Sequence, residues 1–158
     1  MQETILIILI IVVFIVLAIL TVSHAPLFPL KKELREKIKE HGVIHFTSPE
    51  NASLILKSGC LKGSISRFEK ILGPLVWTYQ YNNEQEIDLK HNYLLKKKRG
   101  IDDPKNFSVC LIITGFNDDI ISKTCTRHGI INDKPIVFKS NYIYPQNIEI
   151  IKKWKYED

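Results

Sequence analysis

The chain opens with an unbroken hydrophobic run over residues 5–22, built only from Ile, Leu, Val, Phe, Ala and Thr. At about 1.5 Å per residue, a helix of this length covers most of the hydrocarbon core of a bilayer. A cleaved signal peptide is the alternative, but no Lys or Arg precedes the run, and Pro26 directly follows the small-residue site at residues 23–25. The pattern therefore predicts an uncleaved anchor over residues 1–25 that crosses the membrane once.

A charged segment over residues 26–42 follows the hydrophobic run and begins with a connector that contains two prolines. Within it, Leu30, Leu34 and Ile38 recur at helical spacing, which is typical of an amphipathic helix. Gly42 is of the residue type most often found just beyond a helix end. We predict a helix that ends at Gly42 and either covers the following domain or lies on the lipid headgroups.

The rest of the chain, residues 43–158, begins with a short extended piece over residues 43–47 and a helix with clear signals at both ends. Ser48 is a typical N-cap, Pro49 suits the first helical position, and Gly59 suits the residue after the last turn. The apolar residues at helical spacing, which we expect to be buried, are Ala52, Ile55 and Leu56.

Further hydrophobic runs predict strands that are separated by polar turns. The most continuous run, residues 107–114, has the composition of a central strand buried on both faces. The polar stretch 82–100 ends in a basic cluster at residues 96–99, interpreted as a solvated helix end or loop, and residues 115–119 are expected to form a turn. Together these patterns predict one α+β domain with a mixed sheet and flanking helices, preceded by one N-terminal transmembrane helix. The remaining strand candidates are residues 75–81, 120–126, 136–144 and 148–154.

The charged residues are distributed unevenly along the chain, which carries a formal net charge of +5. Every Lys and Arg lies after the hydrophobic run, whereas Glu3 precedes it. The positive-inside tendency therefore places the C-terminal domain in the cytoplasm and the N-terminus outside. The positive charge also suits an anionic lipid surface, nucleic acid or a phosphate-bearing small molecule. Net charge alone does not distinguish among these three kinds of partner.

The cysteines give no sign of a metal site. Cys60, Cys110 and Cys125 form no CxxC pair and have no histidine at metal-ligand spacing. We expect three free or buried thiols and predict no bound metal.

The common signatures for nucleotide hydrolysis, zinc proteolysis and serine hydrolysis are absent from the sequence. Residues 44–48, Ile-His-Phe-Thr-Ser, lead into the capped helix, and Ile-Leu-x-x-Gly-x-Leu follows at residues 55–61. This arrangement resembles the opening of the ADP-ribosyltransferase superfamily, in which a strand ending in His-aromatic-Thr precedes a helix closed by a turn of that type. The resemblance implies that NAD binds with His45 on the ribose next to nicotinamide, while the backbone of Phe46 and Thr47 helps to hold the carboxamide.

A second part of the resemblance lies at residues 140–145, Ser-Asn-Tyr-Ile-Tyr-Pro, which are similar to the last catalytic strand of the poly(ADP-ribose) polymerase-like branch. The residue before Tyr-Ile is usually glutamate in that branch, and here it is Asn141. An amide keeps a hydrogen bond to the ribose but cannot balance the charge that develops on the sugar. The resemblance also implies an aromatic residue that stacks on nicotinamide, for which Tyr79 and Tyr81 are the candidates.

Three functions remain open. The first is a membrane-anchored, ADP-ribosyltransferase-like protein that has an α+β fold of that superfamily, binds NAD and transfers ADP-ribose to a macromolecular acceptor, with Asn141 at the catalytic position. The second is a non-catalytic, membrane-tethered interaction module of the same fold, such as an inhibitor or an immunity-like partner. The third is a basic domain that binds nucleic acid or anionic lipid through residues 96–99. If a carboxylate elsewhere in the chain takes the role of the glutamate that Asn141 replaces, the candidates are Asp118, Asp119 and Asp133.

Overall fold

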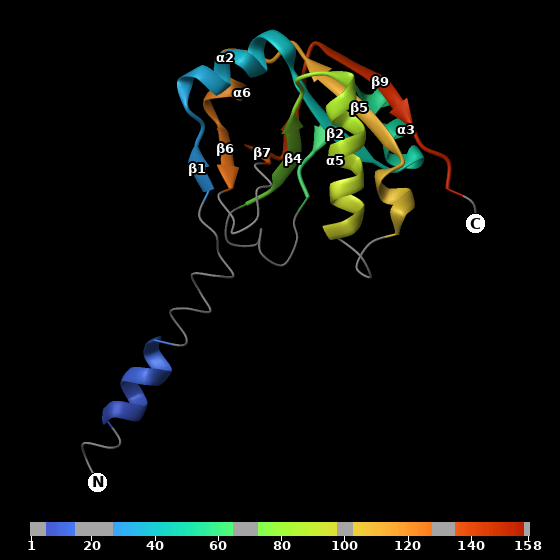
Figure 1. Ribbon diagram of the computed structural model, residues 1–158. Coiled ribbons are helices and arrows are strands. Elements are labelled where there is room, and N and C mark those ends of the chain that lie inside the picture. Colours follow the sequence, from blue (N-terminus) through green and yellow to red (C-terminus); the bar gives the residue numbers. More distant parts are fainter. Residues whose placement is uncertain (1–5, 15–26, 65–72, 98–102, 128–134, 157–158) are drawn as a thin grey trace.

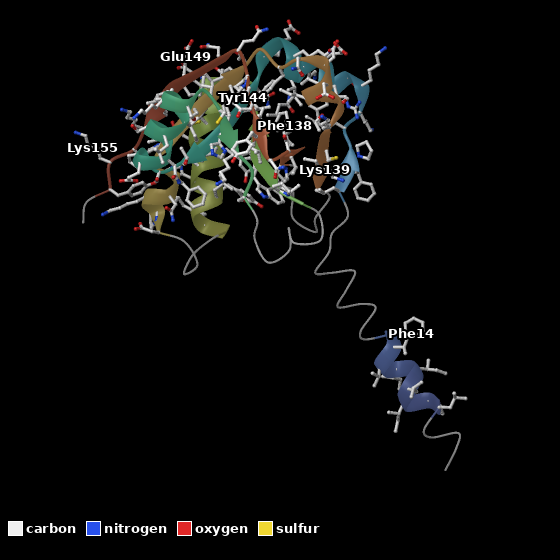
Figure 2. All side chains as sticks on the ribbon, turned by 180° about the vertical axis from the view of Figure 1, so that it is seen from behind. Phe14, Phe138, Lys139, Tyr144, Glu149 and Lys155 are labelled. Carbon is white, nitrogen blue, oxygen red and sulfur yellow. The ribbon has the colours of Figure 1, made fainter. Side chains whose placement is uncertain are left out.

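The computed structural model describes residues 6–14, 27–64, 73–97, 103–127 and 135–156 (Figure 1). Residues 6–14 form a helix whose side chains are all exposed, and Phe14 projects from its end (Figure 2). The rest of the predicted membrane helix, residue 5 and residues 15–22, lies outside the described residues. In the part of the chain that is described, no helix is both long enough and apolar enough to cross a membrane, so the predicted anchor gains no support from the structure.

A seven-stranded sheet in the order β1-β6-β7-β4-β2-β5-β9 forms the centre of the described fold. Each pair of neighbouring strands runs antiparallel, so the predicted α+β class is confirmed while the predicted mixed sheet is antiparallel at every described pairing. A separate two-stranded sheet joins β3, Leu61–Lys62, to β8, Tyr142–Ile143. The strands of the larger sheet are β1 Leu27–Pro29, β2 Val43–Thr47, β4 Leu75–Gln80, β5 Val109–Thr114, β6 Thr124–Arg127, β7 Ile136–Lys139 and β9 Asn147–Lys153.

The predicted end of α2 and both predicted ends of α3 are confirmed. The helix α2, Lys32–His41, ends at Gly42, whose N–H donates to the carbonyl of Ile38. The helix α3, Pro49–Ser58, begins after Ser48, which accepts a hydrogen bond from the N–H of Asn51, and ends at Gly59 in the left-handed conformation. The prediction for the buried face of α3 is only partly right, because Ala52 is buried and Ile55 partly buried, whereas Leu56 is 40% exposed.

The long helix α5, Glu84–Lys97, fills most of the polar stretch 82–100, for which no element was predicted. Residues 96–97 of the basic cluster lie at its end. Three strand predictions differ from the structure. Residues 120–126 do not form one strand, because the cap by Asn117 starts the short helix α6, Asp118–Ser122, before β6. The predicted strand at residues 136–144 is divided between two sheets as β7 and β8, and residues 104–107 form the 3-10 helix η1, Pro104–Phe107, ahead of β5.

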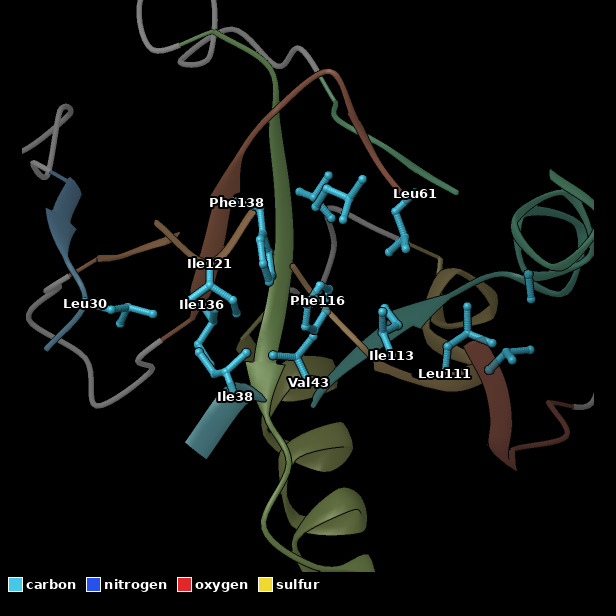
Figure 3. Packing of buried hydrophobic residues seen from close by; sticks show 14 residues of the cluster. Leu30, Ile38, Val43, Leu61, Leu111, Ile113, Phe116, Ile121, Ile136 and Phe138 are labelled. Atoms are coloured by element: carbon cyan, nitrogen blue, oxygen red, sulfur yellow. The ribbon is translucent and has the colours of Figure 1, made fainter. Parts of the chain in front are cut away.

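The sheet is covered on both faces, and each face has its own hydrophobic cluster. The first cluster joins the sheet to α2, α3 and α6 and contains Val43, Leu111 and Phe138, with Phe116 packed 5.1 Å from Phe138 between ring centroids (Figure 3). The second cluster lies under α5, which crosses the face of β2 and β5 (Figure 1). Because side chains alternate along a strand, β2 contributes Val43 to the first cluster and Ile44 and Phe46 to the second.

Candidate functional site

The ladder between β2 and β4 ends just before His45, and we call this end of the ladder the opening. β2 pairs with β4 only at Val43 and Ile44, which lie opposite Gln80 and Tyr79. Residues 75–78 of β4 pair with β7 instead. All five residues of β2 pair with β5 on its other side. The two strands therefore share one short ladder and then follow different neighbours, so β2 has no β4 partner from His45 onward.

His45 is fixed at this opening by one hydrogen bond across it. Its Nδ1 lies 2.8 Å from the carbonyl oxygen of Trp77. Because a carbonyl oxygen can only accept, Nδ1 carries the proton and donates, and Nε2 is the acceptor of the neutral ring. Burial lowers the pKa of His45, and the hydrogen bond to Trp77 opposes that effect. The site thus holds a neutral, oriented imidazole that can accept a hydrogen bond from a hydroxyl group.

The residues after His45 turn toward the start of α3. Thr47 and Ser48 are both buried, and the side chain of Ser48 caps the helix with a distance of 3.2 Å from Oγ to the N–H of Asn51. Phe46 lies in the second hydrophobic cluster, on the face of the sheet opposite His45. The side chain of Phe46 thus fixes the backbone of residues 46–47 to the second cluster. The edge of β2 that faces β4 has no ladder partner at these residues.

The two tyrosines predicted to stack on nicotinamide lie on the α5 face. Tyr79 and Tyr81 both pack against the second cluster, and the ammonium of Lys90 lies 4.5 Å from the ring centroid of Tyr79. Since Tyr79 is in register with Ile44, it projects to the face opposite His45. The structure does not bring these tyrosines together with His45. The aromatic residue that contacts His45 is Trp77, through its backbone carbonyl, and the sequence pattern did not single it out.

Asn141 lies in the bend between β7 and β8 and is exposed. Its carbonyl oxygen accepts a hydrogen bond of 2.8 Å from the N–H of Gly63. Because β4 lies between β2 and β7 in the sheet, the strand of His45 and the strand that leads to Asn141 are both neighbours of β4 and do not pair with each other. The strand that leads to Asn141 therefore lies on the other side of β4 from His45, and no contact joins the two residues in the described chain.

The other carboxylates are committed elsewhere or lie outside the described residues. Asp118 pairs with Lys39 at 2.6 Å, and Asp119 pairs with Lys123 at 2.7 Å, both at the ends of α6. Asp133 lies outside the described residues, as do residues 98–99 of the basic cluster. Glu149 accepts a hydrogen bond from Asn147 on β9 and is labelled at the far edge of the sheet in Figure 2. Among the described residues, no group of His, Cys, Asp and Glu could hold a metal ion.

No protein-family model, curated protein or solved structure matches this chain. The functional argument therefore depends on the residues and on their arrangement in the fold.

Proposed function

We propose that this chain binds NAD in the manner of the ADP-ribosyltransferase superfamily, with His45 as the ribose contact. The observation that supports this most strongly is the orientation of His45 at the point where β2 leaves β4. Its ring is neutral, its Nδ1–H is held by the Trp77 carbonyl, and Nε2 remains as an acceptor for a ribose hydroxyl. The N-cap of α3, Ser48, follows three residues later, as the resemblance requires.

The nicotinamide end of NAD is expected beside residues 46–47. The edge of β2 that faces β4 has no strand partner there within the described chain. Backbone N–H and C=O groups of such an edge need hydrogen-bond partners, and a carboxamide offers both a donor and an acceptor. In this proposal the carboxamide takes the place that a β4 residue would occupy in a continuous ladder. Trp77 joins His45 as a residue of the site through its backbone.

Transfer of ADP-ribose breaks the bond between the nicotinamide nitrogen and the anomeric carbon of the ribose. Nicotinamide leaves with the electron pair of that bond, and the acceptor nucleophile bonds to the anomeric carbon and loses its proton to solvent. Asn141 can hold a ribose hydroxyl but brings no negative charge to the cation-like sugar. The proposal is therefore an NAD-binding domain whose transfer of ADP-ribose to a macromolecular acceptor is slow. The same asparagine favours a non-catalytic interaction module as the second candidate.

We also propose that residues 5–22 anchor this domain in a membrane, with the domain on the cytoplasmic side. All nine described residues of this run are apolar, and each is between 48% and 71% exposed. An uncharged run of this kind gains more from lipid than from water. Protease added to intact cells should leave the domain uncut. Digestion while the membrane is shown to be sealed would reverse the proposed orientation.

The central experiment uses the full chain in detergent micelles and NAD labelled in its adenylate part. Wild type should bind NAD, and His45→Ala should abolish binding without loss of the folded state. His41→Ala is the matched control, because His41 is an exposed histidine on α2 whose Nε2 lies 3.6 Å from Glu40 of the same helix. If wild type binds no NAD, or if both histidine variants bind equally, the proposed function is wrong.

Asn141→Glu tests the transfer step separately from binding. A well-placed group of this kind can be worth about 3 kcal/mol in the transition state, or roughly a hundredfold in rate. Asn141→Gln is the control, because it lengthens the side chain by the same amount without adding charge. Release of nicotinamide should rise in the glutamate variant only. An NAD-binding protein in which neither variant gains activity would favour the interaction module.

A further inference from the structure

At the end of β9 and in the residues that follow it, every second side chain from Lys152 to Tyr156 bonds to α5. Lys152 pairs with Asp88 at 2.5 Å, and the indole Nε1 of Trp154 donates to the other oxygen of the same carboxylate at 3.2 Å. The hydroxyl of Tyr156 lies 2.7 Å from Nε2 of His91. These five residues, which we call the C-terminal clasp, join the last strand to two positions one helical turn apart on α5.

His91 is the centre of the C-terminal clasp and is only 3% exposed. The ring also has a backbone hydrogen bond to Phe107, which opposes the lowering of the pKa of His91 by burial, so its polar contacts come from η1 and from Tyr156. Burial lowers the pKa of His91 and raises the pKa of Tyr156. The ring of Trp154 stacks on the imidazole at 3.8 Å with an interplanar angle of 5°. The side chains of the C-terminal clasp thus form one compact, hydrogen-bonded unit.

The C-terminal clasp also contacts β2 directly. The ring of Phe46 lies 6.0 Å, between centroids, from both His91 and Trp154, and it is 7% exposed. Phe46 also pairs through its backbone with Cys110, which in turn pairs with Lys152. Residues at the end of the chain therefore reach Phe46 by two routes, through the ladder and through ring packing.

We propose that the C-terminal clasp positions the backbone of residues 46–47 for the nicotinamide end of NAD. The inference rests on the proposed function, because it assigns the C-terminal clasp a role in that same site. Beyond Ile44, β2 has lost its β4 neighbour, so its position depends on β5 and on the packing of Phe46. A misplacement of about 1 Å can cost a hundredfold in a reaction rate, and we expect a loosening of Phe46 to weaken, by the same loss of geometry, the hydrogen bonds of residues 46–47 to the carboxamide.

The experiment uses the full chain with Tyr156→Phe, which removes one hydroxyl from the C-terminal clasp and keeps its ring. Thr124→Val is the matched control, since Thr124 is fully buried and donates to the Ile121 carbonyl at 2.6 Å, on β6, which β7 and β4 separate from β2. Both variants lose one intramolecular hydrogen bond, and urea unfolding should show similar losses of stability. Amide hydrogen exchange over residues 43–48 and the dissociation constant for NAD are then measured for both.

Tyr156→Phe should raise the exchange rate over residues 43–48 and the dissociation constant for NAD about fivefold beyond the control, the effect of one hydrogen bond. Trp154→Phe, which keeps an aromatic ring against Phe46, should bind NAD better than Trp154→Ala. Equal exchange in Tyr156→Phe and Thr124→Val would overturn the positioning role whether or not NAD binds. If Tyr156→Phe exchanges faster than the control but wild type binds no NAD, the proposed function is wrong. The role of the C-terminal clasp in NAD binding is then wrong as well.

Discussion

Gly63 should be difficult to replace because its neighbours leave no space for a side chain. A Cβ at this position would lie 2.3 Å from the carbonyl oxygen of Ser140, 3.0 Å from Cβ of Pro74 and 3.2 Å from the N–H nitrogen of Leu75. Contacts under 3.0 Å are essentially never seen for real Cβ atoms, so β3 and the bend before β8 would have to separate. That movement would strain or break the bond from Gly63 N–H to Asn141.

The cost of Gly63→Ala follows from these contacts. Overpacking against rigid neighbours costs about 1–3 kcal/mol, and a weakened backbone hydrogen bond adds about 1 kcal/mol. We expect the free energy of unfolding to fall by about 2–4 kcal/mol, measured by urea titration with tryptophan fluorescence. Because the bond to Asn141 is also affected, nicotinamide release by a Gly63→Ala, Asn141→Glu double variant should be lower than by Asn141→Glu alone.

Gly59→Ala is the control for the loss of a glycine as such. Gly59 has a φ of 66°, and a Cβ there would meet no atom within 4 Å. Its replacement should cost only the strain of a left-handed residue, about 1–2 kcal/mol. If Gly63→Ala is no more destabilising than Gly59→Ala, the close approach between β3 and the bend at Ser140 does not constrain the fold, and the argument from space is refuted.

Three further outcomes follow from single contacts. Ser48→Ala should lower the free energy of unfolding by about 1 kcal/mol through loss of the α3 cap, as measured by urea titration. In native protein, iodoacetamide should modify the partly exposed Cys60 and leave Cys110 unmodified, because Cys110 is fully buried and burial raises its pKa to about 12; mass spectrometry of the modified peptides checks this. Burial lowers the pKa values of His45 and His91 below 6.5, so unfolded chains bind more protons, and stability should fall as the pH drops below about 6.5 and level off below the folded-state values. Urea titrations across this pH range would show no such slope if the two histidines were charged in the folded protein.

The elements that the sequence predicts well are those fixed by local chemistry. Ser48, Pro49 and Gly59 each act through hydrogen bonds or dihedral angles within one helical turn, and the structure has α3 between them. β5 was predicted from a continuous apolar run, and it lies between β2 and β9, buried on both faces. Such signals need no knowledge of the rest of the chain.

The elements that were missed depend on distant partners. The helix α5 is largely polar, and its residues Asp88 and His91 have partners that follow the last strand, more than sixty residues later. Neither residue has the apolar character that identifies a buried helix face. The division of residues 136–144 follows from β3 and Gly63, which capture β8 in a second sheet. No local pattern in that stretch indicates where its pairing partner changes.

The same limit applies to the proposed site, and it separates the question of binding from that of catalysis. His45 is held on β2 through Trp77, whereas Asn141 is held through Gly63 by a different sheet. Substitutions at position 141 therefore leave the hydrogen bond that orients His45 intact, and the identity of that residue can change without loss of the β2 site. If the β2 site binds NAD, a chain that has lost the catalytic carboxylate keeps the means to bind it. This independence explains how one fold could serve either a slow transferase or a binding module.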